Sequence, residues 1–320
     1  MKRLLARLLG GRRTPDAAPP PANKALWAIG IFGGTSPLAL GPQPGVANPV
    51  ITRDDVTDVP ASFVADPFLH RVDGTWHLFF EVLNRRTGLG EIALATSTDL
   101  AAWRYERVVL AEPFHLSYPH VFEWQGAIYM VPEAHATRSL QVYRADSFPT
   151  RWTHAHTLLS GGVFSDATLF QHDDRWWLFT ETSEPRRHDT LRLFHADEPF
   201  GAWMEHPSSP IVSGDRTTAR PAGRVVRTNA GFVRFAQVCA PRYGTSVKAF
   251  GITELTTSTY AERALSDAPV LAGSGVAGAW NATRMHHVDA HEVAPGRWIA
   301  AVDGARDVTK AEVDGNALRR

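Results

Sequence analysis

Three features of this 320-residue sequence predict an all-β fold, a five-bladed β-propeller. A unit of strand, tight turn, aromatic strand and third strand recurs, with Trp76, Ile128 and Trp176 equivalent and spaced 52 and 48 residues apart. Segments with helical periodicity are hard to find, and the chain holds 25 glycines and 22 prolines. A period of about 50 residues with four strands per unit is typical of propeller blades.

Three units of this repeat are clear. They begin with the sequences ADPFLHRV, SYPHVFEW and SDATLFQH. Their predicted turns are Asp73-Gly74, Gln125-Gly126 and Asp173-Asp174. An Asp-Gly pair between two apolar strands is a strong signal for a hairpin. The second strand of each unit ends in a carboxylate, which is Glu81, Glu133 or Glu181. We expect these glutamates to stabilise the blades at least as much as they serve chemistry.

Two weaker units complete the predicted ring. One opens at Arg220 and the other at His286, and the last one runs out of chain before a full blade is formed. An incomplete blade needs a strand from elsewhere. Leu26–Gly33 (LWAIGIFG) is apolar and has no turn partner of its own. We therefore predict a propeller over residues 26–307, with the ring closed by this N-terminal strand.

The ends of the chain are predicted to lie outside the propeller. Residues 1–25 comprise a basic segment, MKRLLARLLGGRR, and a Pro/Ala linker, and residues 308–320 form a tail. Arg7 interrupts the leucines and no A-x-A site follows, so we predict no secretion signal and a cytoplasmic location. A basic amphipathic segment such as residues 1–13 is suited to weak contact with the inner face of a membrane. The alternative is a solvated terminus.

Composition excludes several classes of function. The 33 basic and 33 acidic residues balance, whereas a nucleic-acid-binding protein shows a basic excess or stripe. A single cysteine, Cys239, excludes an internal disulfide framework and a zinc site built from cysteines. No apolar run approaches the roughly 18 residues that a membrane span needs.

Candidate catalytic residues lie where the inner strands of the blades begin. These positions converge on one mouth of the central channel, which is the default place for a site. Asp66 and Asp166 start the first and third units and form a candidate carboxylate pair for chemistry at a sugar. Glu133 is a further catalytic candidate beside Tyr118 and His120, which we predict to bind substrate. The alternative for both aspartates is a turn-capping role.

Arg220 and Arg224 open the fourth unit and are predicted to bind an anionic group of the substrate. A guanidinium binds a carboxylate or phosphate through two hydrogen bonds. The alternative is a structural ion pair with Asp66 or Asp166, because buried carboxylates recruit arginine.

The fifth unit contains a dense cluster of ionisable residues. Strand alternation predicts that His287, Asp289 and His291 share one face while His286 points the other way. Such a face is able to ligate a metal. We prefer a substrate-contact role, and we predict no metal and no cofactor, because a metal site also needs supporting residues.

Several motifs in order resemble one known family. They are ADPFL, LFFE, LSYPHVF, YMVPEA, FSDATLF, ARPAGRVV, AWNATRMHHVDAHEV and GRWIAAVDG. Over about Leu26 to Asp303 they resemble the N-terminal domain of plant glucosamine inositolphosphorylceramide transferase and its bacterial relatives. That domain is similar to the five-bladed propellers of glycoside hydrolase families 43 and 32. In the plant protein a separate glycosyltransferase domain follows, so the resemblance does not transfer that activity to this chain.

The hydrolase resemblance implies roles for particular residues. Asp66 matches the catalytic carboxylate that these propellers carry in the first blade. Their second-blade aspartate is replaced here by Tyr118-Pro119-His120, and their third-blade glutamate by Asp166. The resemblance therefore implies Asp66 as base or nucleophile, with Asp166 or Glu133 as the acid.

The sequence as a whole predicts a propeller that acts on a glycosidic bond, by hydrolysis or transfer. The two arginines favour an anionic or phosphorylated glycan or donor, and no nucleic acid is expected as a partner. The first alternative is a non-catalytic glycan-recognition domain that works beside a separate glycosyltransferase. The second is a protein-interaction scaffold, because fold alone does not fix function. Whether the protein is an enzyme stays open at this point.

Overall fold

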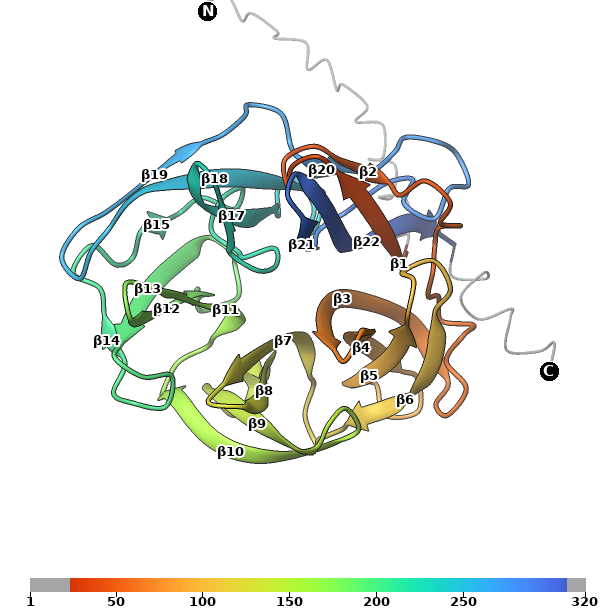
Figure 1. The fold of residues 1–320 in the computed structure, drawn as a ribbon, viewed down its shortest axis with the longest axis horizontal. Helices are drawn as coiled ribbons and strands as arrows, with labels where there is room; N and C mark the ends of the chain where they lie inside the picture. The colour runs from red at the N-terminus through yellow and green to blue at the C-terminus, as the bar shows by residue number, and fades with distance from the viewer. Residues whose placement is uncertain (1–23, 310–320) are drawn as a thin grey trace, which may run out of the picture.

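The computed structural model describes residues 24–309, which form five antiparallel sheets around a common axis (Figure 1). The predicted five-bladed propeller is confirmed. Residues 1–23 and 310–320, which include the predicted basic segment and most of the predicted tail, lie outside the described residues. Within residues 24–309 the one helical segment is the 3₁₀ turn η1 (His135–Thr137), and no helix in this range is long and apolar enough to cross a membrane.

Blades 1 to 3 follow the chain from the axis outwards. Blade 1 comprises β3 (Ala61–Val72), β4 (Thr75–Asn84), β5 (Gly90–Ser97) and β6 (Arg104–Leu110). Blade 2 comprises β7 (Ser117–Trp124), β8 (Ala127–Glu133), β9 (Ser139–Ser147) and β10 (Arg151–Ser160). Blade 3 comprises β11 (Ser165–His172), β12 (Arg175–Glu181), β13 (Thr190–Ala196), β14 (Met204–Glu205) and β15 (Val212–Ser213). The three repeat units of the sequence are therefore these three blades.

The predicted turns join the first two strands of these blades. Asp73 and Gly74 have φ values of 49° and 81°, and Asp173 and Asp174 have values of 50° and 55°. Two central residues with positive φ are the mark of a turn whose twist matches that of the flanking strands. Glycine and aspartate tolerate this backbone region better than most residues.

Blade 4 has a broken inner strand. It comprises β16 (Val226–Thr228), β17 (Gly231–Val238), β18 (Ser246–Leu255), β19 (Tyr260–Ala264) and β20 (Leu271–Ala272). Before β16, the chain touches β17 through one isolated bridge between Pro221 and Ala236. Proline has no N–H to donate to a ladder, which explains the interruption. The short β16 leaves Arg220 and Arg224 in irregular backbone.

Blade 5 closes the ring with strands from both ends of the described chain. It comprises β21 (Val288–Ala294), β22 (Arg297–Val308), β1 (Lys24–Gly34) and β2 (Leu40–Pro42). β1 pairs antiparallel with β22 from Lys24↔Val308 to Gly34↔Trp298. Closure by the N-terminal strand is confirmed, and it removes the open edge that an incomplete blade would expose.

The hydrophobic core lies between neighbouring blades. Leu78 and Phe80 of blade 1, for example, belong to the same cluster as Ile29 and Ile31 of blade 5. A tryptophan follows the third strand in each of blades 1 to 3 and donates an indole hydrogen bond to a backbone carbonyl three or four residues earlier. These residues are Trp103, Trp152 and Trp203. Because apolar groups fill the spaces between blades, many of the buried charged groups gather at the axis.

Candidate functional site

The inner strands of blades 1, 2 and 3 carry the same bulge. In blade 1 the pairing of β3 with β4 skips two residues after Ala65, and β7 and β11 skip at the equivalent place. The bulged residues Asp66, Tyr118 and Asp166 have φ values of 52°, 48° and 53°. Strained backbone of this kind clusters at functional sites, and a bulge re-aims a side chain. Each of the three side chains contacts a residue of another blade.

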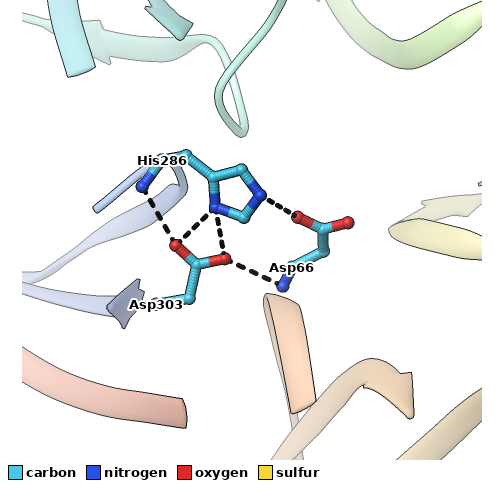
Figure 2. Close-up of side chains that lie close together, drawn as sticks. All are labelled: Asp66, His286 and Asp303. Carbon is cyan, nitrogen blue, oxygen red and sulfur yellow. Dashed lines mark hydrogen bonds and ion pairs between the residues drawn. The ribbon is translucent and has the colours of Figure 1, made fainter. Parts of the chain in front are cut away.

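Asp66 forms a buried cluster with His286 and Asp303 of blade 5 (Figure 2). Nδ1 of His286 lies 2.7 Å from the Asp303 carboxylate, and Nε2 lies 3.5 Å from Oδ1 of Asp66. Asp303 also accepts backbone N–H bonds from Asp66, His286 and His287, each 3.1 Å long. Because Asp303 accepts these bonds, Nδ1 of His286 carries a proton and Nε2 is directed toward Asp66.

The charge state of Asp66 is poised near neutral pH. Its burial raises the pKa of Asp66 to about 6, with His286 opposing the shift and Asp303 adding to it. Burial opposes a charge on His286, but Asp303 and Asp66 outweigh burial and raise the pKa of His286. Oδ1 of Asp66 has no hydrogen-bond partner among residues 24–309. This oxygen is itself buried, and it faces Nε2 of His286 across 3.5 Å.

Arg220 joins Asp166 and Glu133 in a second buried cluster. Its Nε lies 2.6 Å from Asp166 Oδ2, and its Nη2 lies 3.0 Å from Glu133 Oε2. Nη1 of Arg220 lies 2.9 Å from His188 Nδ1, and Gln237 donates a 2.6 Å bond to Asp166. Only 4% of the Arg220 side chain is exposed. Of the two roles predicted for Arg220, the structure shows the ion pair with Asp166.

The two carboxyls of this cluster differ in proton affinity. Burial raises the pKa of Asp166 well above its usual range, although Arg220 opposes the shift. Burial acts on Glu133 in the same sense, but Arg220, His135 and Arg186 outweigh it and hold the pKa of Glu133 well below its usual range. Neighbouring carboxyls with opposite shifts divide acid and base roles between them. Asp166 is the one suited to hold a proton.

Arg224 belongs to a third group of ion pairs. Its Nε lies 2.9 Å from Asp289 Oδ1, and His291 Nε2 lies 2.8 Å from Asp289 Oδ2. The backbone N–H of Leu69 donates a 2.6 Å bond to Asp289. Burial opposes a charge on Asp289, but Arg224 and His291 outweigh it and lower the pKa of this carboxyl. Two residues of the predicted blade 5 face, Asp289 and His291, are thus paired with each other, and Asp289 is also paired with Arg224 of blade 4.

Tyr118 crosses the axis and is fully buried. Its hydroxyl accepts a 2.8 Å bond from the N–H of Gly223 and lies 2.7 Å from Thr168 Oγ1. Gly223 has a φ of 126°, and a Cβ there would lie 1.8 Å from the carbonyl oxygen of Val288. The close approach of blades 4 and 5 therefore requires glycine at this position, and the Tyr118 hydroxyl ties blade 2 to it.

Phe68 collects the remaining aromatic side chains of the axis. The rings of Tyr118, His120 and His287 all meet Phe68 edge-on, at centroid distances of 4.8, 5.3 and 4.7 Å. His120 and His287 are fully buried. The contact of these two histidines with substrate stays a prediction, because the structure shows both rings buried and packed against Phe68.

Arg186 reaches the second cluster from the solvent side. It lies in the loop between β12 and β13, and its Nη2 is 2.8 Å from Glu133 Oε1. Its Nη1 lies 3.3 Å from His135 Nδ1. The Arg186 side chain is 35% exposed, whereas that of Glu133 is 1% exposed. The Arg186 guanidinium is therefore accessible to a ligand that approaches the Arg220 cluster.

Asp66, His286 and Asp303 are also the one group among the described residues whose ligand atoms lie close enough to share an ion. The Asp303 carboxylate already accepts three backbone N–H bonds and the Nδ1 bond of His286. Two protein donors are left, Asp66 and Nε2 of His286, fewer than the three or four of a typical transition-metal site. The cluster fits a hydrogen-bonded unit better than a metal site.

The sequence did not predict His286 and Asp303 as site residues. His286 precedes β21, so the strand alternation used to predict its direction does not apply to it. Asp303 is a lone carboxylate in the apolar run WIAAVDG of β22. A buried carboxylate needs partners, which is the one signal that could have identified it.

A family model described as "Glucosamine inositolphosphorylceramide transferase 1, N-terminal" matches residues 20–305. The chain belongs to this family. Two curated relatives carry the name glucosamine inositolphosphorylceramide transferase 1. The one from Oryza sativa subsp. japonica is 38% identical over 311 residues, covering 89% of this chain and 41% of that protein. The one from Arabidopsis thaliana is 33% identical over 303 residues, covering 89% and 39%. The chain thus spans about two fifths of the length of these relatives.

Solved structures with the same fold include glycoside hydrolases. The catalytic domain of the Coprinopsis cinerea GH62 α-L-arabinofuranosidase has a TM-score of 0.57 at 15% identity, covering 88% of this chain and 97% of that one. The exo-β-1,3-galactanase 1,3Gal43A of Clostridium thermocellum has a TM-score of 0.54 at 12% identity, covering 66% and 51%. At these identities the likeness shows the fold alone, and the resemblance to hydrolase propellers is confirmed at that level.

Proposed function

We propose that this propeller acts on a glycosidic bond, by hydrolysis or by glycosyl transfer, at the mouth lined by Asp66 and Asp166. The observation that carries the proposal is Asp66 itself. It has a left-handed backbone and a pKa of about 6, and Nε2 of His286 lies 3.5 Å from its Oδ1. A strained, buried carboxyl with a shifted pKa is typical of a catalytic group.

The two carboxyls suit complementary roles. Ionised Asp66 would take a proton from water or from an acceptor hydroxyl as that oxygen attacks the anomeric carbon, or would attack the carbon itself. Protonated Asp166 would give its proton to the leaving oxygen. Glu133 was the other candidate for the acid, and its lowered pKa favours Asp166. The Asp303–His286 pair would hold Asp66 in place.

The pH dependence of activity tests this assignment. Because a base acts when ionised, kcat/KM is expected to rise as the pH increases through about 6, the pKa of Asp66. The unfolded chain releases this proton near pH 3.8, so the contribution of Asp66 to the free energy of unfolding is expected to fall as the pH rises from 3.8 to about 6 and to level off above that. The measurement is a pH–rate profile on a substrate that does not itself ionise in this range. A flat profile between about pH 5 and about pH 7 would contradict Asp66 as the base.

An anionic substrate is the second part of the proposal, and Arg186 now supports it. All three arginines pair with a carboxylate, but the side chains of Arg220 and Arg224 are 4% and 20% exposed, whereas that of Arg186 is 35% exposed. Arg186→Met is expected to weaken binding of a sugar phosphate by about tenfold, the value of one charge-assisted hydrogen bond. Calorimetric titration at low and high salt checks this, because salt screens an exposed charge. Arg107→Met, on the outer strand of blade 1, is the control. An Arg186→Met protein that binds sugar phosphate as wild type does would remove the argument for an anion.

A non-catalytic glycan-recognition domain is the alternative function. One observation favours it, because Asp166 and Glu133 are each only 1% exposed and fully engaged with Arg220. A recognition domain would bind a glycan at the same mouth and leave it intact. The cytoplasmic location and the membrane contact of residues 1–13 stay predictions.

A further inference from the structure

A cleft lies against β1 and β22, the two middle strands of blade 5. It has a volume of about 570 Å³. Its walls come from β1, from the segment that follows β2, from the segment that precedes β21 and from Arg306 of β22. β1 and β22 are the neighbouring red and dark blue strands in Figure 1. Two of its lining residues, Arg53 and Trp280, have features that point to a ligand.

Trp280 provides a fixed aromatic surface in this cleft. A Cβ added at Gly30 of β1 would lie 2.7 Å from its indole ring, and one at Gly304 of β22 would also lie 2.7 Å from it. The indole therefore lies directly over two glycines of paired strands, which leave it the space that any other side chain would take. A ring held in this way loses little freedom when a ligand packs on it.

Arg53 provides a positive charge whose one ion pair among the described residues, with Asp54, is 3.8 Å long. Its side chain is only 9% exposed, and its Nη1 is buried with no hydrogen-bond partner among residues 24–309. The carboxylate of Asp54 lies 3.8 Å from its Nε, beyond hydrogen-bond distance, and is itself 67% exposed. A buried N–H without an acceptor destabilises a fold, and a native structure that keeps one calls for an explanation.

We propose that this cleft binds a small organic anion whose carboxylate or phosphate accepts hydrogen bonds from Arg53 and whose ring face packs on Trp280. The guanidinium fork matches the geometry of both anionic groups, and an indole face receives the apolar face of a ring. The cleft shares no ionisable residue with the mouth at Asp66. Trp27 lines the cleft and stacks on His286 of the Asp66 cluster at a centroid distance of 4.1 Å, so the two places are neighbours.

Isothermal titration calorimetry on the full chain tests the proposal, with glucuronate, glucose 6-phosphate and uncharged glucose as probes. At least one charged probe is expected to bind, and the two of them distinguish a carboxylate from a phosphate. Arg53→Met and Trp280→Leu are each expected to weaken that binding by about tenfold or more. Arg151→Met, an exposed arginine on blade 2, is the matched control and is expected to bind as wild type does. Because Arg186→Met is expected to weaken sugar-phosphate binding at the mouth, the titrations are repeated in the Arg186→Met protein, where the remaining binding of a charged probe is expected to depend on Arg53.

Thermal melting without ligand separates a binding role from a structural one. Because Arg53 lacks a hydrogen-bond acceptor, Arg53→Met is expected to melt at or above the wild-type temperature. Arg53→Lys keeps the charge, loses the planar fork and is expected to lose less affinity than Arg53→Met. The proposal is overturned if neither charged probe binds the wild-type protein. It is overturned equally if Arg53→Met and Arg53→Lys bind a charged probe as tightly as wild type.

Discussion

Replacing Arg220 by methionine is expected to lower the free energy of unfolding by about 3–5 kcal/mol, the usual effect of breaking a buried ion pair from one side. The Arg220 guanidinium bonds to Asp166 and Glu133, and each of these carboxyls is 1% exposed. Without Arg220, Asp166 loses its cation and Glu133 keeps only one of its two arginine partners, the partly exposed Arg186. Urea denaturation followed by circular dichroism measures the change.

Two further variants test whether the stability lost in Arg220→Met comes from breaking the buried ion pairs. Arg220→Lys keeps the charge but cannot reach both carboxyls with a planar fork, so it is expected to recover only part of the stability. Arg138→Met removes an exposed arginine paired with Glu184 and is expected to leave the free energy of unfolding nearly unchanged. An Arg220→Met protein as stable as wild type would show that the cluster does not hold the fold together.

Replacing Asp66 by asparagine is expected to lower kcat/KM by about a hundredfold to ten-thousandfold, the range of general acid–base catalysis. Asparagine has the same shape but takes no proton, so the base or nucleophile is lost. Oδ1 of Asp66 has no hydrogen-bond partner among the described residues, and burial disfavours its charge. The melting temperature at neutral pH is therefore expected to stay at or above that of wild type.

The control for this variant is Asp73→Asn. Asp73 also has a left-handed backbone, with a φ of 49°, but it lies in the exposed hairpin turn of the same blade. It is expected to retain full activity and stability. If Asp66→Asn unfolds the protein while Asp73→Asn does not, Asp66 is a structural cap and its catalytic role is excluded.

Most of the fold was predictable because its determinants are local. Hairpin turns such as Asp73-Gly74, the alternation of each strand and the spacing of the tryptophans lie within single blades. Closure by the N-terminal strand was also predictable, because the last blade lacked a strand and Leu26–Gly33 lacked a partner. The broken inner strand of blade 4 was not, since it follows from one proline in the least regular repeat.

The site was predictable only in part, because its contacts join distant parts of the chain. Asp66 and Asp166 stood out as repeat positions within their blades. The hydrogen bond from Asp66 to Asp303 joins residues 237 positions apart and exists only once the ring has closed. Likewise, the carboxylate partners of Arg220 lie far away in the sequence: Asp166 is 54 positions away and Glu133 is 87 positions away. No spacing in the sequence encodes such a pair.

The most direct test of the central claim is product analysis by mass spectrometry in ¹⁸O-labelled water. Wild-type protein, Asp66→Asn and Asp73→Asn would each be incubated with glycosides and nucleotide sugars, in the presence and absence of acceptor alcohols. We expect wild type and Asp73→Asn to break a glycosidic bond, and Asp66→Asn to leave it intact. The product is expected to contain ¹⁸O if water attacks and to lack it if an acceptor alcohol attacks. A glycan that binds the wild-type protein at the mouth and is recovered intact would contradict catalysis and favour recognition.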